Sequence, residues 1–365
     1  MRRSDRKQQG LAILTVLLIV ALMVTLLGFL VEQQHLLIRR ISNQNVAEQG
    51  YQYAQGVNSW GARVLFDDQN RQVDYLGEDW AKFGKSGESE EVNEDSFSLD
   101  LSSQEKEQPL PIVDFDFDGL EYEIIDLNSR YNLNNLAVRE PNVLNQQKVI
   151  YMNLLELAGI EELGIRDQLY GALIDWLDEN DLANANGVES GTYQVKSTPY
   201  YASDQKLSSL GELRFVEGYT IDIINKIKPY VTVLPIENAK LNINTVSAEV
   251  LSSISQAPVS DIGPVIAFLS TREQEAFLGF SAGDIEAAKT AIIGVNAVAA
   301  LPANNMMQVN SQFFQINTKV LLGDFQFCMK TVMMRGNASA DSNSSNKVTE
   351  LSREYDTLCN DGPAV

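Results

Sequence analysis

The apolar residues in the first part of the chain predict one very long helix. The run from Leu11 to Val31 carries no charge, and it is long enough to cross a hydrocarbon core, which needs about 20 residues of helix. Beyond it, apolar residues recur at spacings of three and four, the signature of one helical stripe; they are Val46, Ala47, Tyr51, Ala54, Val57, Trp60 and Val64. No proline precedes Pro109, so we expect an unbroken helix to about Leu65, roughly 80 Å long.

The rest of the chain changes its pattern twice. Residues 111–127 alternate polar and apolar positions around Asp118-Gly119, which predicts a β-hairpin. From about residue 128, short amphipathic helices are separated by Gly, Pro and Asn, and from Met307 strand-like alternation returns. We therefore expect an α+β fold, in which the long helix packs on an antiparallel sheet and a large all-α insertion interrupts the sheet-forming sequence.

These changes divide the chain into five parts. They are a basic leader (1–10), the membrane-spanning half of the helix (11–31), the first part of the body (32–127), an all-α inserted domain (128–305) and the C-terminal strands of the body (306–365). The first part of the body includes an acidic, serine-rich stretch, residues 85–108, which indicates a solvated loop.

Charge and histidine content exclude two classes of function. The 365 residues include 28 basic and 49 acidic ones, a formal net charge of -21, whereas nucleic-acid binding needs a basic surface. The single histidine, His35, lies beside the predicted membrane span, so we expect no histidine-based catalytic triad. The stretch "LNINTVSAEVLSSI" (241–254) also resembles a DNA-binding hairpin, but acidic residues surround it and Lys240 stands alone. We interpret Asn244 or Thr245 as the N-cap of a core helix.

The segment before the apolar run indicates an orientation and a processing site. Four basic residues and one acidic residue precede Gly10, so the leader should stay in the cytoplasm. The chain would then cross the inner membrane once and place its C-terminal domain in the periplasm. Cleavage between Gly10 and Leu11 would remove the charges and keep the apolar helix, the reverse of an ordinary signal peptide. This order resembles the precursor of a type IV pilin or pseudopilin; the alternative is an uncleaved signal anchor.

Thr15 departs from the pilin-like pattern. Such precursors usually carry Glu five residues after the cut, and counting from Leu11 that position is Thr15. A carboxylate inside a bilayer is costly and is kept only for a partner, which in these fibres is the free amino terminus of the subunit above. A subunit with nothing above it has no such amine, so Thr15 is expected at the tip of a fibre.

Several stretches, in order along almost the whole chain, resemble one family. They are "DLNSRYNLNNLA" (126–137), "LIDWLDEND" (173–181), "PYYASDQKLSSLGELRFVEGY" (199–219) and "KLNINTVSAEVLSSI" (240–254). Together with the glycine-ended leader they resemble the K component of the type II secretion system, its largest minor pseudopilin. The resemblance implies a pilin-like body with a helical insertion and a non-enzymatic role.

The resemblance also implies partners. The chain would be cut by the prepilin peptidase and N-methylated on Leu11. With other minor pseudopilins, it would start or cap the periplasmic pseudopilus. Secreted proteins are further candidate partners.

An acidic stretch after the middle of the chain is a candidate metal site. The stretch "DWLDENDLANANGVESGTY" (175–193) is rich in oxygen ligands, and a turn at Asn186-Gly187 would bring Glu189 toward Asp178 and Asp181. Oxygen donors without His or Cys suit calcium rather than zinc. Spacing alone leaves a merely solvated acidic loop equally open, and the resemblance implies calcium ligands at Asp178, Glu189 and Asp204.

A second acidic motif does not complete a calcium loop. Asp114, Asp116 and Asp118 imitate the opening of an EF-hand, but its twelfth position is Ile125 rather than a bidentate Glu. We interpret this stretch as the hairpin described above.

The two cysteines lie in the exported part of the chain, where a disulfide can persist. Antiparallel pairing of Cys328 with Cys359 would centre a hairpin on residues 343–344, within a run of turn-forming residues. The same register would set Val332 opposite Tyr355 and Met334 opposite Arg353. We expect a disulfide between Cys328 and Cys359; the alternative is two unpaired thiols.

Two other functions remain open on the sequence. A signal-anchored periplasmic hydrolase could use carboxylates, although no paired-acid motif stands out from the acidic background. A calcium-binding adhesin or minor type IV pilin could be displayed at the cell surface.

Overall fold

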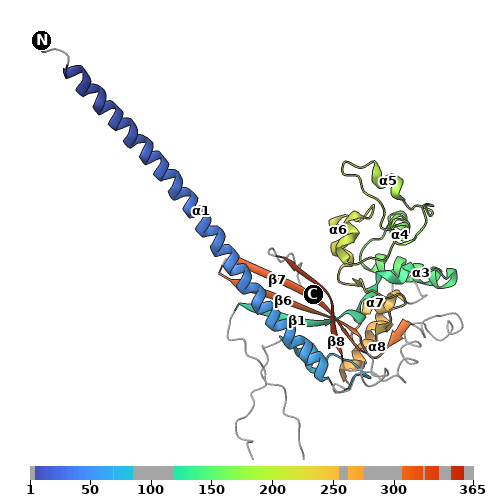
Figure 1. Cartoon of the computed structure of the whole chain (residues 1–365). Helices are drawn as coiled ribbons and strands as arrows, with labels where there is room; N and C mark the ends of the chain where they lie inside the picture. The colour runs from blue at the N-terminus through green and yellow to red at the C-terminus, as the bar shows by residue number, and fades with distance from the viewer. Residues whose placement is uncertain are drawn as a thin grey trace, which may run out of the picture.

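The computed structural model describes residues 5–68, 70–84, 119–254, 262–274, 306–323, 325–336 and 347–356. Within these residues the chain forms a long helix, a four-stranded sheet and a block of mainly helical elements (Figure 1). This arrangement confirms the predicted α+β class. We call the part between β1 and β6 the helical block.

Helix α1 runs from Asp5 to Asp67, which confirms the expected unbroken helix. Its N-terminal half projects away from the body (Figure 1), and the large apolar side chains from Ile13 to Ile41 are all exposed. Among the described residues it is the one helix long and apolar enough to cross a membrane. Such a large apolar surface indicates contact with lipid or with other helices.

The sheet is antiparallel, with the strand order β1-β6-β7-β8. Its strands are β1 (Leu120–Asp126), β6 (Phe313–Leu322), β7 (Phe325–Arg335) and β8 (Val348–Asp356). Along β6, buried and half-buried residues alternate, as expected when one face of a strand packs on a helix. The C-terminal half of α1 lies along β6 and β7 (Figure 1).

Two glycines and one asparagine position α1 on this sheet. A Cβ atom at Gly50 would lie 2.8 Å from the Cβ of Phe327, and one at Gly61 would lie 2.7 Å from the Cδ1 of Ile316. Between them the buried Asn58 donates a hydrogen bond of 2.6 Å to the Oγ1 of Thr331. Because a buried polar group without its partner is costly, this bond favours one position of the helix along the sheet.

The helical block contains short helices joined by irregular segments. Its helical elements are η2 (Leu127–Ser129), η3 (Leu133–Ala137), α3 (Pro141–Leu157), α4 (Leu163–Leu177), α5 (Ser190–Gln194), η4 (Leu210–Phe215), α6 (Ile221–Ile227), α7 (Ala248–Ser253) and α8 (Gly263–Gln274). They surround a core of fully buried side chains that includes Tyr131, Tyr151, Leu154, Leu173 and Leu213.

Buried asparagines replace regular secondary structure in the segments between these helices. Asn134 accepts a hydrogen bond from Leu207 N at 2.9 Å and donates to Leu234 O at 2.8 Å. Asn135 accepts from Ala239 N at 2.8 Å and donates to Ala239 O at 3.1 Å. These bonds explain why the stretch "NLNNLA" is so rich in asparagine: each side chain satisfies backbone groups that no helix or strand satisfies.

The expectation of an all-α insertion is wrong in one respect. Three two-residue strands lie within residues 128–305: β2 (Tyr131–Asn132), β3 (Val231–Thr232) and β4 (Leu241–Asn242). β2 pairs in parallel with β3, and β4 pairs in parallel with β5 (Met307–Gln308), which lies in the stretch predicted to form strands. Such short strands have too few residues to show an alternating pattern, so periodicity could not reveal them.

Two local predictions are also wrong. Helix α7 has Ser247 as its N-cap, with the side chain accepting from Val250 N, rather than Asn244 or Thr245, which take part in buried hydrogen bonds before it. In the β7–β8 hairpin, Val332 lies opposite Ser352 and Met334 opposite Thr349, with an irregularity after Val332. The antiparallel pairing was predicted correctly, but from Cys328 to Val332 the partners lie three residues away from the predicted ones, and the irregularity after Val332 adds one more residue. The alternating pattern alone does not give the register of the hairpin, and it does not reveal bulges.

Other predicted features lie partly outside the described residues. In the register of the hairpin the buried Cys328 is opposite Asp356, and Cys359 lies beyond the described end of β8. The disulfide therefore stays a prediction. Strand β1 is the second half of the hairpin predicted at 111–127, and the first half, the acidic stretch 85–108 and Asp114, Asp116 and Asp118 all lie outside the described residues.

A buried polar network joins the helical block to the sheet. The carboxylate of Asp126, at the end of β1, accepts from Ser311 Oγ at 2.5 Å, from Thr245 Oγ1 at 2.5 Å and from Asn242 Nδ2 at 3.3 Å. The same Asn242 amide donates to Asp74 O at 3.0 Å. Segments far apart in the sequence therefore meet at one carboxylate, and every donor named here is used.

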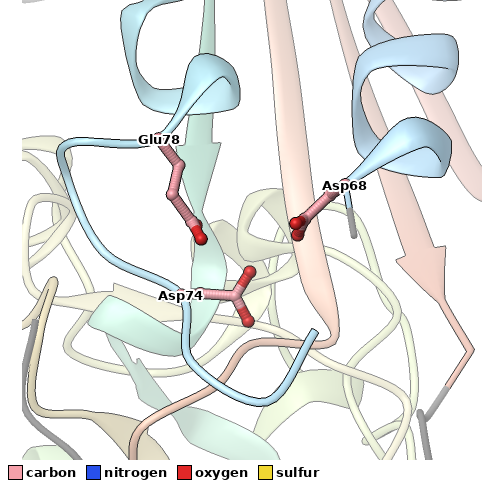
Figure 2. A group of neighbouring side chains, drawn as sticks. All are labelled: Asp68, Asp74 and Glu78. Carbon is pink, nitrogen blue, oxygen red and sulfur yellow. The ribbon is translucent and has the colours of Figure 1, made fainter. Parts of the chain in front are cut away.

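Arg335 extends this network to the end of α1. Its guanidinium is 2% exposed, forms salt bridges with Asp68 and with Asp74, and donates to Ser311 O at 3.0 Å. The third carboxylate, Glu78, points toward the same place (Figure 2). It accepts from Trp80 Nε1 at 2.6 Å and from Tyr75 N at 3.2 Å. We call Asp68, Asp74, Glu78 and Arg335 the arginine cluster.

Burial, together with neighbouring negative charge, raises the pKa values of two carboxyl groups in the arginine cluster. Burial, with a smaller contribution from Asp74 and Asp68, raises the pKa of Glu78 to about 8. Burial also raises the pKa of Asp74 to about 6, although Arg335 opposes that shift. Both carboxyl groups thus bind a proton more tightly in the folded chain than in the unfolded chain, and the folded state loses this advantage as the pH rises.

We predict that the free energy of unfolding falls between about pH 4.5 and pH 8, where Glu78 titrates first in the unfolded and then in the folded chain. Glu78→Gln keeps both hydrogen bonds without a charge, so it should flatten this pH dependence and stabilise the chain at pH 9. One unit of pKa difference corresponds to about 1.4 kcal/mol, which urea unfolding of the full chain in detergent can resolve. Glu161→Gln, at an exposed position, is the control and should leave the slope unchanged. An identical slope in Glu78→Gln and the unsubstituted chain would contradict the prediction.

Candidate metal centre

The predicted metal loop connects two helices of the helical block. Helix α4 ends at Leu177, just before Asp178, and α5 starts just after Glu189. At the two ends of the loop, the rings of Trp176 and Tyr193 pack edge-to-face with centroids 5.4 Å apart. This contact holds the two helix ends together, so the loop leaves and re-enters the helical block at neighbouring points.

The fourth predicted residue comes from a separate segment. Asp204 follows α5 and has a φ of 51°, in the left-handed region that non-glycine residues rarely adopt. The surrounding structure must impose this conformation.

The structure brings the predicted carboxylates into one electrostatic cluster. Burial, followed by the negative charges of Asp175, Asp178 and Asp204, raises the pKa of Glu189 to about 7. Burial and the neighbouring carboxylates Asp175 and Asp204 raise the pKa of Asp178 as well. For Asp204 the pKa is raised by burial and by Asp181. Carboxylates that repel one another in this way favour a bound cation.

Three of these oxygens have no hydrogen-bond partner among the described residues. Both carboxylate oxygens of Glu189 and the Oδ1 of Asp204 are inaccessible to solvent and have no partner in hydrogen-bond geometry, although the backbone N–H of Ser190 is near enough to Glu189 to lower its pKa slightly. Leaving a buried carboxylate oxygen without a donor is costly, and native structures rarely tolerate it. Glu189 and Asp204 therefore fit a cation that the sequence alone could only suggest.

The other two predicted ligands are less available. Asp178 already accepts from Asn180 N at 3.1 Å and from Asn184 Nδ2 at 3.3 Å, so part of its capacity is in use. Asp181 is exposed, and its connection to the cluster is its charge effect on Asp204. The geometry thus ranks Glu189 and Asp204 above Asp178, and Asp178 above Asp181. These donors are all hard oxygens, which fit calcium.

A second group of carboxylates was missed by the sequence analysis. Asp68, Asp74 and Glu78 have ligand oxygens within 4.8 Å of one another (Figure 2). Unlike Glu189, however, two of them already form salt bridges with Arg335, and Glu78 accepts two N–H groups. Because these carboxylates already have their partners, we interpret the arginine cluster as structural. No spacing in "DDQNRQVDYLGEDW" distinguishes these acids from the rest of an acidic chain.

The predicted processing residues lie on the projecting part of α1. Gly10 and Leu11 fall within the helix, and Thr15 is exposed along with the apolar residues around it. This part of α1 is far from the metal loop (Figure 1), so the chain has two separate candidate sites.

Comparisons with known proteins agree on one family. The family model described as "Type II secretion system (T2SS), protein K" matches residues 129–236, most of the helical block. A type II secretion system protein K from Pectobacterium carotovorum is 24% identical over 363 residues, spanning 96% of this chain and 97% of its own. One from Pseudomonas aeruginosa is 28% identical over 342 residues, spanning 91% of this chain and 90% of its own.

A solved structure has a similar fold. It is the crystal structure of the GspK-GspI-GspJ complex from the type 2 secretion system of enterotoxigenic Escherichia coli. The matched chain is 18% identical, with a TM-score of 0.61 over 87% of this chain and 99% of that one. At this identity the likeness shows the fold, while the relatives and the family model bear on the family. The chain is thus similar over nearly its whole length to type II secretion system K proteins, and residues 129–236 match the model of that family.

Proposed function

We propose that the chain is a non-enzymatic minor pseudopilin that starts or caps the periplasmic pseudopilus together with other minor pseudopilins. The observation that carries this proposal is the position of the helical block. It lies beside the sheet, on the side of the body away from the projecting half of α1, and makes the body much wider than the helix and sheet alone (Figure 1). Subunits of a pilus-like fibre stack with their long helices packed along the axis, so a block of this width obstructs a further subunit above. One copy at the tip fits this shape.

The exposed half of α1 supports assembly with other helices. Its apolar side chains from Ile13 to Ile41 cover all faces of the helix, so it can contact lipid before assembly and several neighbouring helices afterwards. The family relative of known structure is solved as a complex with GspI and GspJ. We infer that the partners of this chain are the corresponding minor pseudopilins, with secreted proteins as further candidates.

The same helix supports the proposed route to the fibre. The leader stays in the cytoplasm, the apolar run crosses the inner membrane and the body stands in the periplasm. The prepilin peptidase then cuts between Gly10 and Leu11, and Leu11 is N-methylated. Thr15 has no carboxylate to pair with the amino terminus of a subunit above, which agrees with a position at the tip.

We further propose that the loop of the helical block binds calcium. Glu189 and Asp204 would hold the ion with their unpaired oxygens, and Asp178 would complete the protein ligands after losing its 3.3 Å hydrogen bond from Asn184. A bound calcium supplies positive charge to a cluster of carboxylates, which stabilises the folded block. No reaction is assigned to it.

The processing step can be tested at the cleavage site. We predict that Gly10→Trp blocks cleavage, because the peptidase must fit the residue before the cut, while membrane insertion is unchanged. Immunoblots of membrane fractions would show the uncut precursor, and N-terminal sequencing of the unsubstituted chain should begin at Leu11. A mature chain that begins elsewhere, such as after Gly28, would remove the pseudopilin proposal.

The tip position can be tested by its copy number. We predict that gold-labelled antibody against the helical block marks one end of an isolated pseudopilus, because a single copy is accommodated there. Antibody against the major pseudopilin should label the whole length in the same preparation. Labelling by the block antibody along the shaft would contradict a tip subunit.

The calcium proposal predicts a gain in stability. A ligand that binds only the folded state stabilises it by about 2.7 kcal/mol at a concentration 100 times its dissociation constant. Calcium should therefore raise the melting temperature of the metal-stripped full chain, and Glu189→Gln should abolish most of that rise. Glu161→Gln is the matched control at an exposed position. If calcium does not raise the melting temperature of the unsubstituted chain or of Glu161→Gln, the loop is only a solvated acidic segment.

A further inference from the structure

We propose that Asp175 is the positioning residue of the metal loop: it holds residues 184–187 against α4 and so fixes Glu189, without binding the ion itself. The inference rests on the proposed calcium site. It adds a residue that resembles a ligand in the sequence but has a different role in the structure.

The oxygens of Asp175 are used by the loop. Asp175 lies in the last turn of α4 and is fully buried. Its Oδ1 accepts from Asn184 N at 3.0 Å and from Asn184 Nδ2 at 2.6 Å, and its Oδ2 accepts from Asn184 N at 3.2 Å. Hydrogen bonds to an ionised acceptor are among the stronger ones in proteins. The buried oxygens of Glu189, by contrast, have no donor.

Two glycines let the loop approach Asp175 so closely. A Cβ atom at Gly187 would lie 2.0 Å from Asp175 Oδ2, and one at Gly171 would lie 2.7 Å from Gly187 N. Both glycines are therefore required by space. Between Asn184 and Gly187 the chain turns at Asn186, which has a φ of 63°. Gly187 N donates a hydrogen bond to Asn184 O at 2.9 Å. The turn is closed by the chain's own hydrogen bonds.

The contacts that Asp175 makes with residues 184–187 lie close to the proposed ligands. Glu189 follows Gly187 by two residues, and its carbonyl already accepts from Thr192 N at 2.8 Å in the first turn of α5. The next residue, Ser190, accepts from Ala202 N at 3.0 Å, which ties α5 to the segment that carries Asp204. The two carboxylates with unpaired oxygens are thus held from both sides by protein contacts. A site assembled in this way needs no metal to form its loop, and preorganisation strengthens binding.

The chemistry of Asp175 makes this role testable. Asp175→Asn replaces one acceptor oxygen by an N–H donor that faces the donors of Asn184, so the loop should detach from α4 while no proposed ligand changes. Gly187→Ala should detach the loop from the other side, because its Cβ collides with Asp175 Oδ2. The matched control is Gly164→Ala on the same helix, where a Cβ would meet only the end of Glu162 at 3.8 Å.

The experiment measures two quantities on the full chain in detergent. Hydrogen exchange of the amides of Asn184 and Gly187 is followed in metal-free protein, and calcium binding is followed by titration calorimetry. We expect Asp175→Asn and Gly187→Ala to speed exchange at these amides at least tenfold and to weaken calcium binding at least tenfold. Glu189→Gln should weaken binding without changing metal-free exchange there, and Gly164→Ala should change neither.

Two results would overturn the proposal. If Asp175→Asn weakens calcium binding but leaves metal-free exchange at Asn184 unchanged, Asp175 is a ligand and not a positioning residue. If Gly187→Ala speeds amide exchange at Asn184 but leaves calcium binding unchanged, the contacts of Asp175 with the loop do not position Glu189 for calcium. Failure of the unsubstituted chain to bind calcium would instead overturn the proposed site, and the exchange data would then still report whether Asp175 holds the loop. Should Asp175→Asn fail to fold, Gly187→Ala carries the test, because it leaves every carboxylate in place.

Discussion

The buried guanidinium of Arg335 is the charge at which the long helix, the sheet and the helical block meet. It joins the end of β7 to Asp68 and Asp74, which follow α1, and it lies over the ring of Phe314 at 4.8 Å. Through Ser311 it reaches Asp126 and the helical block. Removing one partner of a buried ion pair usually costs more than the pair contributes, because the remaining charge stays buried. The relative position of helix, sheet and block therefore depends on this charge.

Some parts of the fold could be predicted from the sequence because they repeat a pattern over many residues. The apolar stripe of α1 and the alternation of β6 and β7 extend over several periods, so local exceptions do not hide them. The two-residue strands β2–β5 and the irregularity that leaves Leu351 of β8 without a partner in β7 have no period that the sequence could show. The short strands pair with segments distant in the sequence. The N-cap at Ser247 is a local bond to Val250 N, for which Asn244 and Thr245 were equally suitable candidates.

The candidate sites show a similar division. Glu189 was indicated by the turn at Asn186-Gly187 and Asp204 by the family resemblance, and the structure adds a reason, since the buried oxygens of both include ones without a hydrogen-bond partner. Asp175 belongs to the same acidic stretch, and no sequence rule separates a carboxylate that holds its own loop from one that is free for a cation. The arginine cluster was missed altogether. Its acids are brought together by Arg335, more than two hundred residues further along the chain.

The connection between β1 and β6 bears on the order of folding. Asp126 and Ser311, which form a hydrogen bond, are 185 residues apart in the sequence, and an unfolded loop of that length loses much entropy when its ends meet. The parallel pairing of β4 with β5 brings the chain back beside its starting point. Once the helical block has folded, the sheet strands no longer search across a long flexible loop, because the block presents them as close neighbours. The folded insertion thus shortens the flexible segment between the two halves of the body. Contacts between residues distant in the sequence can then form as quickly as contacts between near neighbours.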